Sequence, residues 1–160
     1  MLLTAGCASA RPASARHPGP RPAATTTAAA ASGHPGPAAE YLAIADAGNR
    51  RLDTDFDHLA GRDSANLTAA RADLHDAAAT ERQFDRSLLA IAFPSASETV
   101  VRALFEANQS RAALARAASA STSRGRLRQY EHRLAAADPP VERAVTTLRS
   151  QLGLPPPDTS

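Results

Sequence analysis

The hydrophobic residues of this chain recur with a helical period over most of residues 38–153. In the segment 64–92, eight positions alternate spacings of three and four, which is typical of the seam of a helical bundle. These positions are Leu67, Ala70, Leu74, Ala77, Glu81, Phe84, Leu88 and Ile91. No segment alternates with a period of two for long enough to predict a strand. The pattern therefore predicts an all-α fold.

The segment Phe84–Phe105 carries the densest apolar side chains and the clearest turn. Pro94 lacks an amide hydrogen and disfavours helical geometry at Phe93, so a helix must end there. Ser95 and Glu98 have the spacing of a capping box, which predicts the start of the next helix. We therefore expect a helical hairpin with its corner at Pro94.

Four long helices follow from these patterns. We expect them at residues 38–60, 64–92, 96–118 and 122–137. Gly61 is expected to end the first helix in a left-handed conformation. Asp138 and Pro139 match the N-cap and first residue of a new helix, so the last helix should break there and a short final helix should follow. The predicted domain is an antiparallel four-helix bundle over residues 38–153, with its last helix broken near Pro139.

Both ends of the chain lack a helical pattern. Residues 8–37 consist mainly of Ala, Pro, Gly, Ser and Thr and contain no large apolar side chain. Such a segment buries too little surface to offset the entropy of ordering it, so we expect residues 1–37 to form a disordered linker behind a short signal-like start. Residues 154–160 are expected to form an extended or disordered Pro-rich tail.

Cys7 is the single cysteine, and it follows small residues in the sequence LTAGC. This setting is similar to a bacterial lipobox, in which the cysteine becomes lipidated, although Thr4 stands where Leu is commonest. Only Met1, Leu2 and Leu3 precede Thr4, too few residues for an apolar signal core. Either translation starts upstream of Met1, which predicts a lipid on Cys7, or the match is accidental and the chain is cytoplasmic. An organellar transit peptide is a further alternative.

The charge is distributed unevenly along the chain. All 18 basic residues are Arg, and the net charge is +2. Residues 38–98 hold six Arg against eleven acids, whereas residues 99–160 hold nine Arg against five acids. The net excess of basic residues is small, whereas a nucleic-acid-binding surface needs basic residues gathered on one face. Nucleic acid is therefore not an expected partner. A cytosolic regulator that binds nucleic acid through Arg124, Arg126 and Arg128 stays as a lower-ranked alternative.

The usual sequence signals of catalysis and metal binding are missing. Asp53, Asp55 and Asp57 imitate the start of a calcium loop, but His58 and Ser64 stand where that loop needs Gly and Glu. No Glu-x-x-His pair, nucleophile elbow or glycine-rich phosphate loop occurs. We predict no enzyme activity, no metal and no cofactor.

One polar constellation lies within the apolar pattern. Glu81 is the one charged residue in the seam of its helix, and a buried carboxylate must be paired, hydrated or protonated. Asn108 and Arg111 interrupt the apolar face of the helix predicted at 96–118. Two interpretations are open. Glu81 reaches solvent or pairs with an Arg of another helix, or Glu81, Asn49, Asn108 and Arg111 line a polar seam that binds a small molecule or metal.

Two segments carry a resemblance to a group of proteins. Residues 41–59, YLAIADAGNRRLDTDFDHL, and residues 80–93, TERQFDRSLLAIAF, resemble small helical-bundle lipoproteins of high-GC actinobacteria, for which no activity is known. The resemblance covers most of residues 38–154. It implies a tethered bundle on the outer face of the cytoplasmic membrane, or a secreted one. The leading hypothesis is therefore a non-enzymatic cell-envelope protein, anchored through Cys7, that acts by contact with a protein partner.

Overall fold

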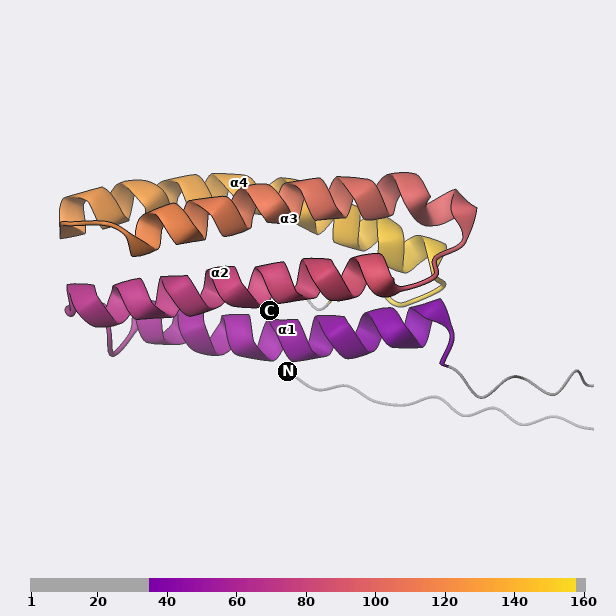
Figure 1. The fold of residues 1–160 in the computed structure, drawn as a ribbon, viewed down its shortest axis with the longest axis horizontal. Helices are drawn as coiled ribbons and strands as arrows, with labels where there is room; N and C mark the ends of the chain where they lie inside the picture. Colours follow the sequence, from indigo (N-terminus) through magenta and orange to yellow (C-terminus); the bar gives the residue numbers. More distant parts are fainter. Residues whose placement is uncertain (1–34, 158–160) are drawn as a thin grey trace, which may run out of the picture. The chain divides into compact units, whose positions relative to one another are not determined.

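The computed structural model describes residues 35–157. The described residues belong to one compact unit, residues 34–160, and this described part is helical. Four α-helices run antiparallel in turn (Figure 1). They are α1 (Pro37–Ala60), α2 (Leu67–Ala90), α3 (Glu98–Ser119) and α4 (Arg124–Gln151). The all-α fold and the four long helices are therefore confirmed, and no strand occurs within 35–157. The predicted linker lies almost wholly outside the described residues, as does Cys7.

Each helix packs mainly on the next helix along the chain, so α2 contacts both α1 and α3, and α3 also contacts α4. The connections between the helices are short, and capping side chains define where α2 and α4 begin. The Asn66 side chain accepts hydrogen bonds from the amides of Thr68 and Ala69, at 3.0 and 3.2 Å, and so starts α2. The Ser123 hydroxyl accepts from the Arg126 amide at 3.3 Å and starts α4.

Gly61 ends α1, but not for the expected reason. Its φ is −99°, so it does not adopt a left-handed conformation. Instead, a Cβ at this position would lie 2.9 Å from the Asp57 carbonyl oxygen. Glycine is favoured here because the backbone turns too tightly for a side chain.

The corner between α2 and α3 lies at Pro94, as predicted, but the capping box does not form. Residues Ser95–Ser97 make a short 3₁₀ turn, and the Glu98 amide donates to the Ser95 carbonyl oxygen rather than to its hydroxyl. The N-cap of α3 is Ser97, whose backbone is helical (φ −97°, ψ −8°) and whose side chain makes no capping hydrogen bond. A side-chain cap requires an extended backbone at the N-cap, so the 3₁₀ turn prevents it.

The predicted break near Pro139 is wrong, because α4 continues through Pro139 and Pro140. Asp138 does not cap a new helix. Its carboxylate lies 2.9 Å from the Nε of Arg111 on α3. Ala144 and Leu148, beyond the prolines, are buried in the core, and their packing offsets the backbone hydrogen bonds that proline removes. Figure 1 shows the last turns of α4, in yellow, inclined to its first half, as expected for a proline kink.

The described part of the C-terminal tail returns to the bundle rather than extending into solvent. Gly153 has a φ of +67°, and the Leu154 amide donates to the Arg149 carbonyl oxygen at 2.9 Å, which makes a Schellman motif. The Arg149 Nε then donates to the Pro155 carbonyl oxygen at 2.6 Å. Residues 154–157 have no regular secondary structure and are ordered against the bundle, so of the two predicted alternatives the structure excludes disorder for these residues.

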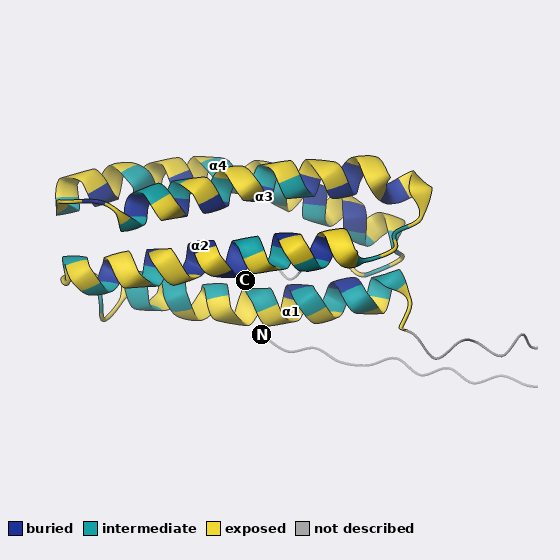
Figure 2. Cartoon of the chain, in the orientation of Figure 1, coloured by how far each residue is buried: buried dark blue, intermediate teal, exposed yellow. Residues whose placement is uncertain are grey.

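The buried residues form two apolar clusters along the bundle (Figure 2). The first cluster consists of Tyr41, Ala45, Leu88, Val100, Val101, Leu104, Ala144 and Leu148. The second consists of Ala70, Leu74, Ala78, Ala115, Ala118, Leu127 and Leu134. Polar residues separate the two clusters along α2 and α3: Glu81 and Asp85 on α2, and Asn108 and Arg111 on α3. We call these four residues and Asp138 the polar layer.

We predict that Leu104→Ala destabilises the bundle whereas Leu89→Ala does not. Leu104 is fully buried in the first cluster, and Leu89 is 59% exposed. Truncating a buried Leu costs about 2–5 kcal/mol, whereas an exposed change stays within about 0.5 kcal/mol. Urea unfolding followed by circular dichroism measures both. Equal effects of the two substitutions would show that the first cluster is misplaced.

Candidate functional site

A cavity of about 100 Å³ lies between side chains from all four helices. All four residues of the predicted polar seam line it, namely Glu81, Asn49, Asn108 and Arg111. The structure therefore brings together residues that are far apart in the sequence. That these four residues contact a ligand stays a prediction.

The helix periods explain why these side chains meet. Glu81 stands in the apolar seam of α2, so the packing of that seam carries its carboxyl group into the bundle. Asn108 and Arg111 are three residues apart, and therefore share one face of α3. Asn49 lies on α1 and is exposed, so the cavity reaches the surface beside it.

Asn108 ties α3 to α2 by two hydrogen bonds. It is 5% exposed, and its Nδ2 donates to the Glu81 carbonyl oxygen at 3.1 Å and to the Asp85 Oδ1 at 2.8 Å. Burial nevertheless raises the pKa of Asp85 above its ordinary value, although the hydrogen bond from Asn108 and the charge of Arg86 act to lower it.

Arg111 lies between two carboxylates. Its Nε is 2.9 Å from Asp138 Oδ1 and 3.4 Å from Glu81 Oε1. Both are ion-pair distances, but neither contact has the alignment of a hydrogen bond. The guanidinium carbon also lies 5.4 Å from the centre of the Phe56 ring, within cation–π range. Arg111 therefore attracts both Glu81 and Asp138, and its Nε donates no well-aligned hydrogen bond to either.

Glu81 is the unusual group of the site. It is 1% exposed, and neither carboxylate oxygen accepts a hydrogen bond from any described residue. Burial raises the pKa of Glu81 to about 7, and the attraction of Arg111 offsets this only in part, because Asp85 and Asp138 also favour the neutral form. Near neutral pH this carboxyl group is able to exchange a proton with a molecule in the cavity or to accept its hydrogen bonds.

Two members of the polar layer were missed by sequence reasoning. Asp85 is 4% exposed and lies one turn after Glu81, on the same face of α2. That spacing of four was a signal for its burial. Asp138 was assigned to a helix start, since an Asp–Pro pair is typical there, and its contact with Arg111 had no signal in the sequence.

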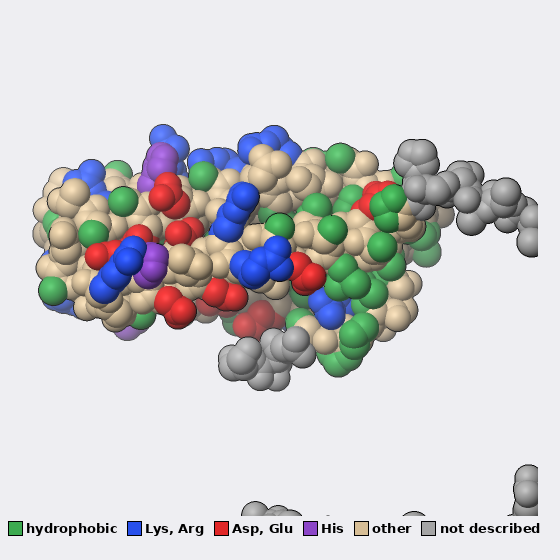
Figure 3. All heavy atoms as spheres, turned by 90° about the horizontal axis from the view of Figure 1, so that it is seen from below, with side chains coloured by type: hydrophobic (Ala, Val, Ile, Leu, Met, Phe, Trp, Pro, Cys, Tyr) green, Lys and Arg blue, Asp and Glu red, His purple; other side chains and the backbone are tan. Residues whose placement is uncertain are grey.

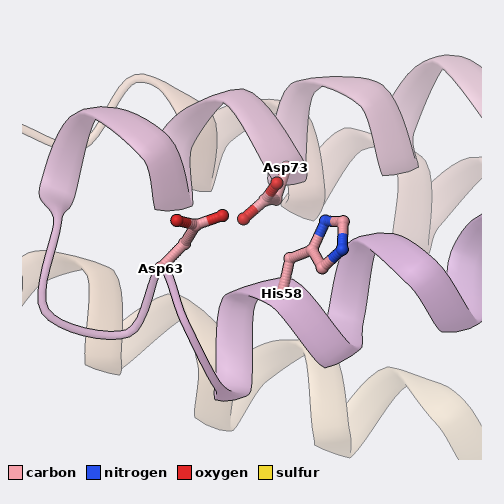
Figure 4. Close-up of side chains that lie close together, drawn as sticks. All are labelled: His58, Asp63 and Asp73. Carbon is pink, nitrogen blue, oxygen red and sulfur yellow. The ribbon is translucent and has the colours of Figure 1, made fainter.

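A second group of side chains resembles a metal site at first sight. His58, Asp63 and Asp73 place possible ligand atoms within 4.8 Å of one another (Figure 4). Arg62 already contacts two of them, because its NH2 lies 2.9 Å from His58 Nδ1 and its Nε lies 3.3 Å from Asp63 Oδ2. Burial, and then the charge of Asp63, raise the pKa of Asp73. Because Arg62 already contacts two of the three possible ligand residues, we assign no metal to this group.

Comparison with protein families, curated proteins and solved structures found no match to this chain. The resemblance to actinobacterial lipoproteins therefore stays a prediction. Within residues 35–157, no helix has the length and apolar character needed to cross a membrane.

We predict that Glu81→Gln stabilises the folded chain at pH 8. The pKa of Glu81 is about 7 in the folded chain against an ordinary value of 4.5, so the folded state holds this proton more tightly. Its contribution to stability is therefore fully present below pH 4.5 and is lost as the pH rises through 7. The loss amounts to about 3 kcal/mol, which a neutral glutamine avoids.

Urea unfolding of both proteins between pH 5 and pH 8 measures this effect. Glu142→Gln, the same change at an exposed position of α4, is the matched control and should follow the parent protein. A Glu81→Gln protein that is less stable than the parent at pH 8, with the same pH dependence, would contradict the assignment.

Proposed function

We propose that this chain is a non-enzymatic, lipid-anchored protein of the cell envelope that acts by contact with a protein partner. The observation that supports contact is an apolar hollow at the corner between α2 and α3. Leu89, Ile91, Phe93, Val101 and Phe105 all line it. Leu89 is the large hydrophobic side chain that stands out as exposed, at 59%.

The hollow has the composition of a small binding surface. Glu98, Arg102 and Glu106 line it from α3 and surround its apolar centre with charges of both signs. An apolar centre with a charged rim is typical of protein interfaces. Figure 3 shows hydrophobic side chains gathered toward the end of the bundle where α1 begins and α2 ends. A contiguous apolar patch on a surface commonly marks an interaction site.

The proposed location is supported by the sequence alone. Cys7 in its lipobox-like setting and the Pro/Ala-rich residues 8–37 are what a tethered domain requires between membrane and bundle.

We predict that a photo-reactive amino acid at Leu89 crosslinks the chain to one partner protein in its native host. The gene is expressed with its own upstream DNA, and the same amino acid at Arg126, an exposed residue of α4, is the control. The chain should sediment with the membrane fraction and incorporate labelled fatty acid. Cys7→Ser should abolish the label and release the chain, because the lipid attaches to that sulfur.

Each part of this experiment has a result that would contradict the proposal. Equal crosslinking from positions 89 and 126, or none from either, would contradict the assigned contact surface. An unlabelled chain that stays in the soluble fraction would contradict the anchor.

A second candidate function is the binding of a small molecule in the cavity of the polar layer. The observation that favours it is Glu81, whose two carboxylate oxygens line the interior without a hydrogen-bond donor from residues 35–157. A buried polar group is ordinarily satisfied, so we expect a donor other than residues 35–157, here a bound molecule, to complete this one.

A further inference from the structure

We infer that the cavity beside Glu81 binds a small protonated amine. This inference rests on the second candidate function and names the class of ligand. Its central observation is a built site: a carboxylate that is 99% buried, lines a cavity and accepts no hydrogen bond from the described chain. An ionised carboxylate in that position needs aligned donors, and an ammonium group supplies three.

Arg111, the cation of the polar layer, does not fully pair with the Glu81 carboxylate. The Nε of Arg111 is closer to Asp138, at 2.9 Å, than to Glu81, at 3.4 Å. Its guanidinium carbon also lies 5.4 Å from the centre of the Phe56 ring. One guanidinium is therefore divided between two carboxylates, while Asp85 adds a third negative charge nearby.

The charges around the cavity favour a cation at its Glu81 end. The groups that act on Glu81 are Arg111 of α3, Asp85 of α2, Asp138 of α4 and Arg82 of α2. From α1, Tyr41 and the uncharged Asn49 line the wall. Arg149 also lines it, but this residue is two helical turns beyond Val141, about 12 Å along α4. Its Nε and NH2 donate to the carbonyl oxygens of Pro155 and Pro156.

The size and lining of the cavity limit the rest of the ligand. A volume of about 100 Å³ equals the share of roughly three water molecules, and a cavity of about 150 Å³ holds benzene. The ligand therefore has about four non-hydrogen atoms, in proportion to benzene. Phe84, Leu104 and Val145 provide an apolar wall for a short alkyl group. The exposed Asn49 marks the mouth through which it enters.

Binding is coupled to the proton of Glu81. The ammonium ion pairs with the ionised carboxylate, so a neutral Glu81 must first release one proton to solvent. Affinity is therefore expected to rise with pH toward 7 and to level off above it, because burial holds the pKa of Glu81 at about 7.

Calorimetric titration of the full chain tests the inference with three probes of similar size: n-propylammonium, neutral 1-propanol and anionic propionate. At pH 8 we expect n-propylammonium to bind about tenfold or more tightly than 1-propanol, and propionate to bind least. At pH 5.5 the affinity for the amine should fall by about thirtyfold, because the pH then lies about 1.5 units below the pKa of Glu81 of about 7. Glu81→Gln should remove the advantage of the amine, while Glu142→Gln should keep it.

The outcomes separate the inference from the function on which it rests. Equal binding of n-propylammonium and 1-propanol would overturn the amine and leave a small-molecule site. Binding of none of the three probes would overturn both, and would show that the cavity holds water only. An amine preference that survives Glu81→Gln, or that is unchanged at pH 5.5 in the parent chain, would place the amine elsewhere and overturn the inference.

Discussion

The burial of Glu81 in the middle of the bundle is the constraint on which the rest of the structure depends. An ionisable group inside an apolar core must be paired, hydrogen-bonded or neutralised. Arg111 of α3 pairs with Glu81 in part, because it is shared with Asp138 of α4, while Asn108 binds the Glu81 carbonyl oxygen and the neighbouring Asp85. The result is a polar layer that divides the core into two apolar clusters. The apolar residues of both clusters are mainly Ala, Val and Leu, so the helices approach closely around the charged groups.

The polar layer links stability to binding. Replacing buried ionic groups by apolar ones is often neutral or stabilising, so such a layer is weak evidence for stability by itself. Here the arrangement also leaves a cavity beside the least satisfied member, Glu81. Its pKa of about 7 makes both the stability and the proposed binding of a cation respond to pH in the physiological range. The apolar hollow at the α2–α3 corner is a separate surface, formed by other residues, and supports the proposed contact with a partner.

The sequence was enough to predict the helices, because the spacing of three and four in α2 and the turn at Pro94 are local signals. Glu81, Asn108 and Arg111 were also identifiable, since each interrupts an apolar face. The capping box at Ser95 was wrong because a local 3₁₀ turn forms there instead, and the break at Pro139 was wrong because tertiary packing overruled a local pattern. Asp138 pairs with Arg111, and Ala144 and Leu148 beyond Pro140 are buried in the core, so α4 continues. Such long-range contacts cannot be predicted from the local sequence pattern.

The most direct test of this account is the titration of the Glu81 side chain itself. Carbon-detected NMR follows the carboxyl carbon of each Glu between pH 3 and pH 9, and the spectrum of Glu81→Gln identifies the resonance. The account predicts a midpoint near 7 for Glu81, because burial opposes its charge. A midpoint near the ordinary value of 4.5 would show that Glu81 is solvated or fully paired, and would contradict the central role given to it.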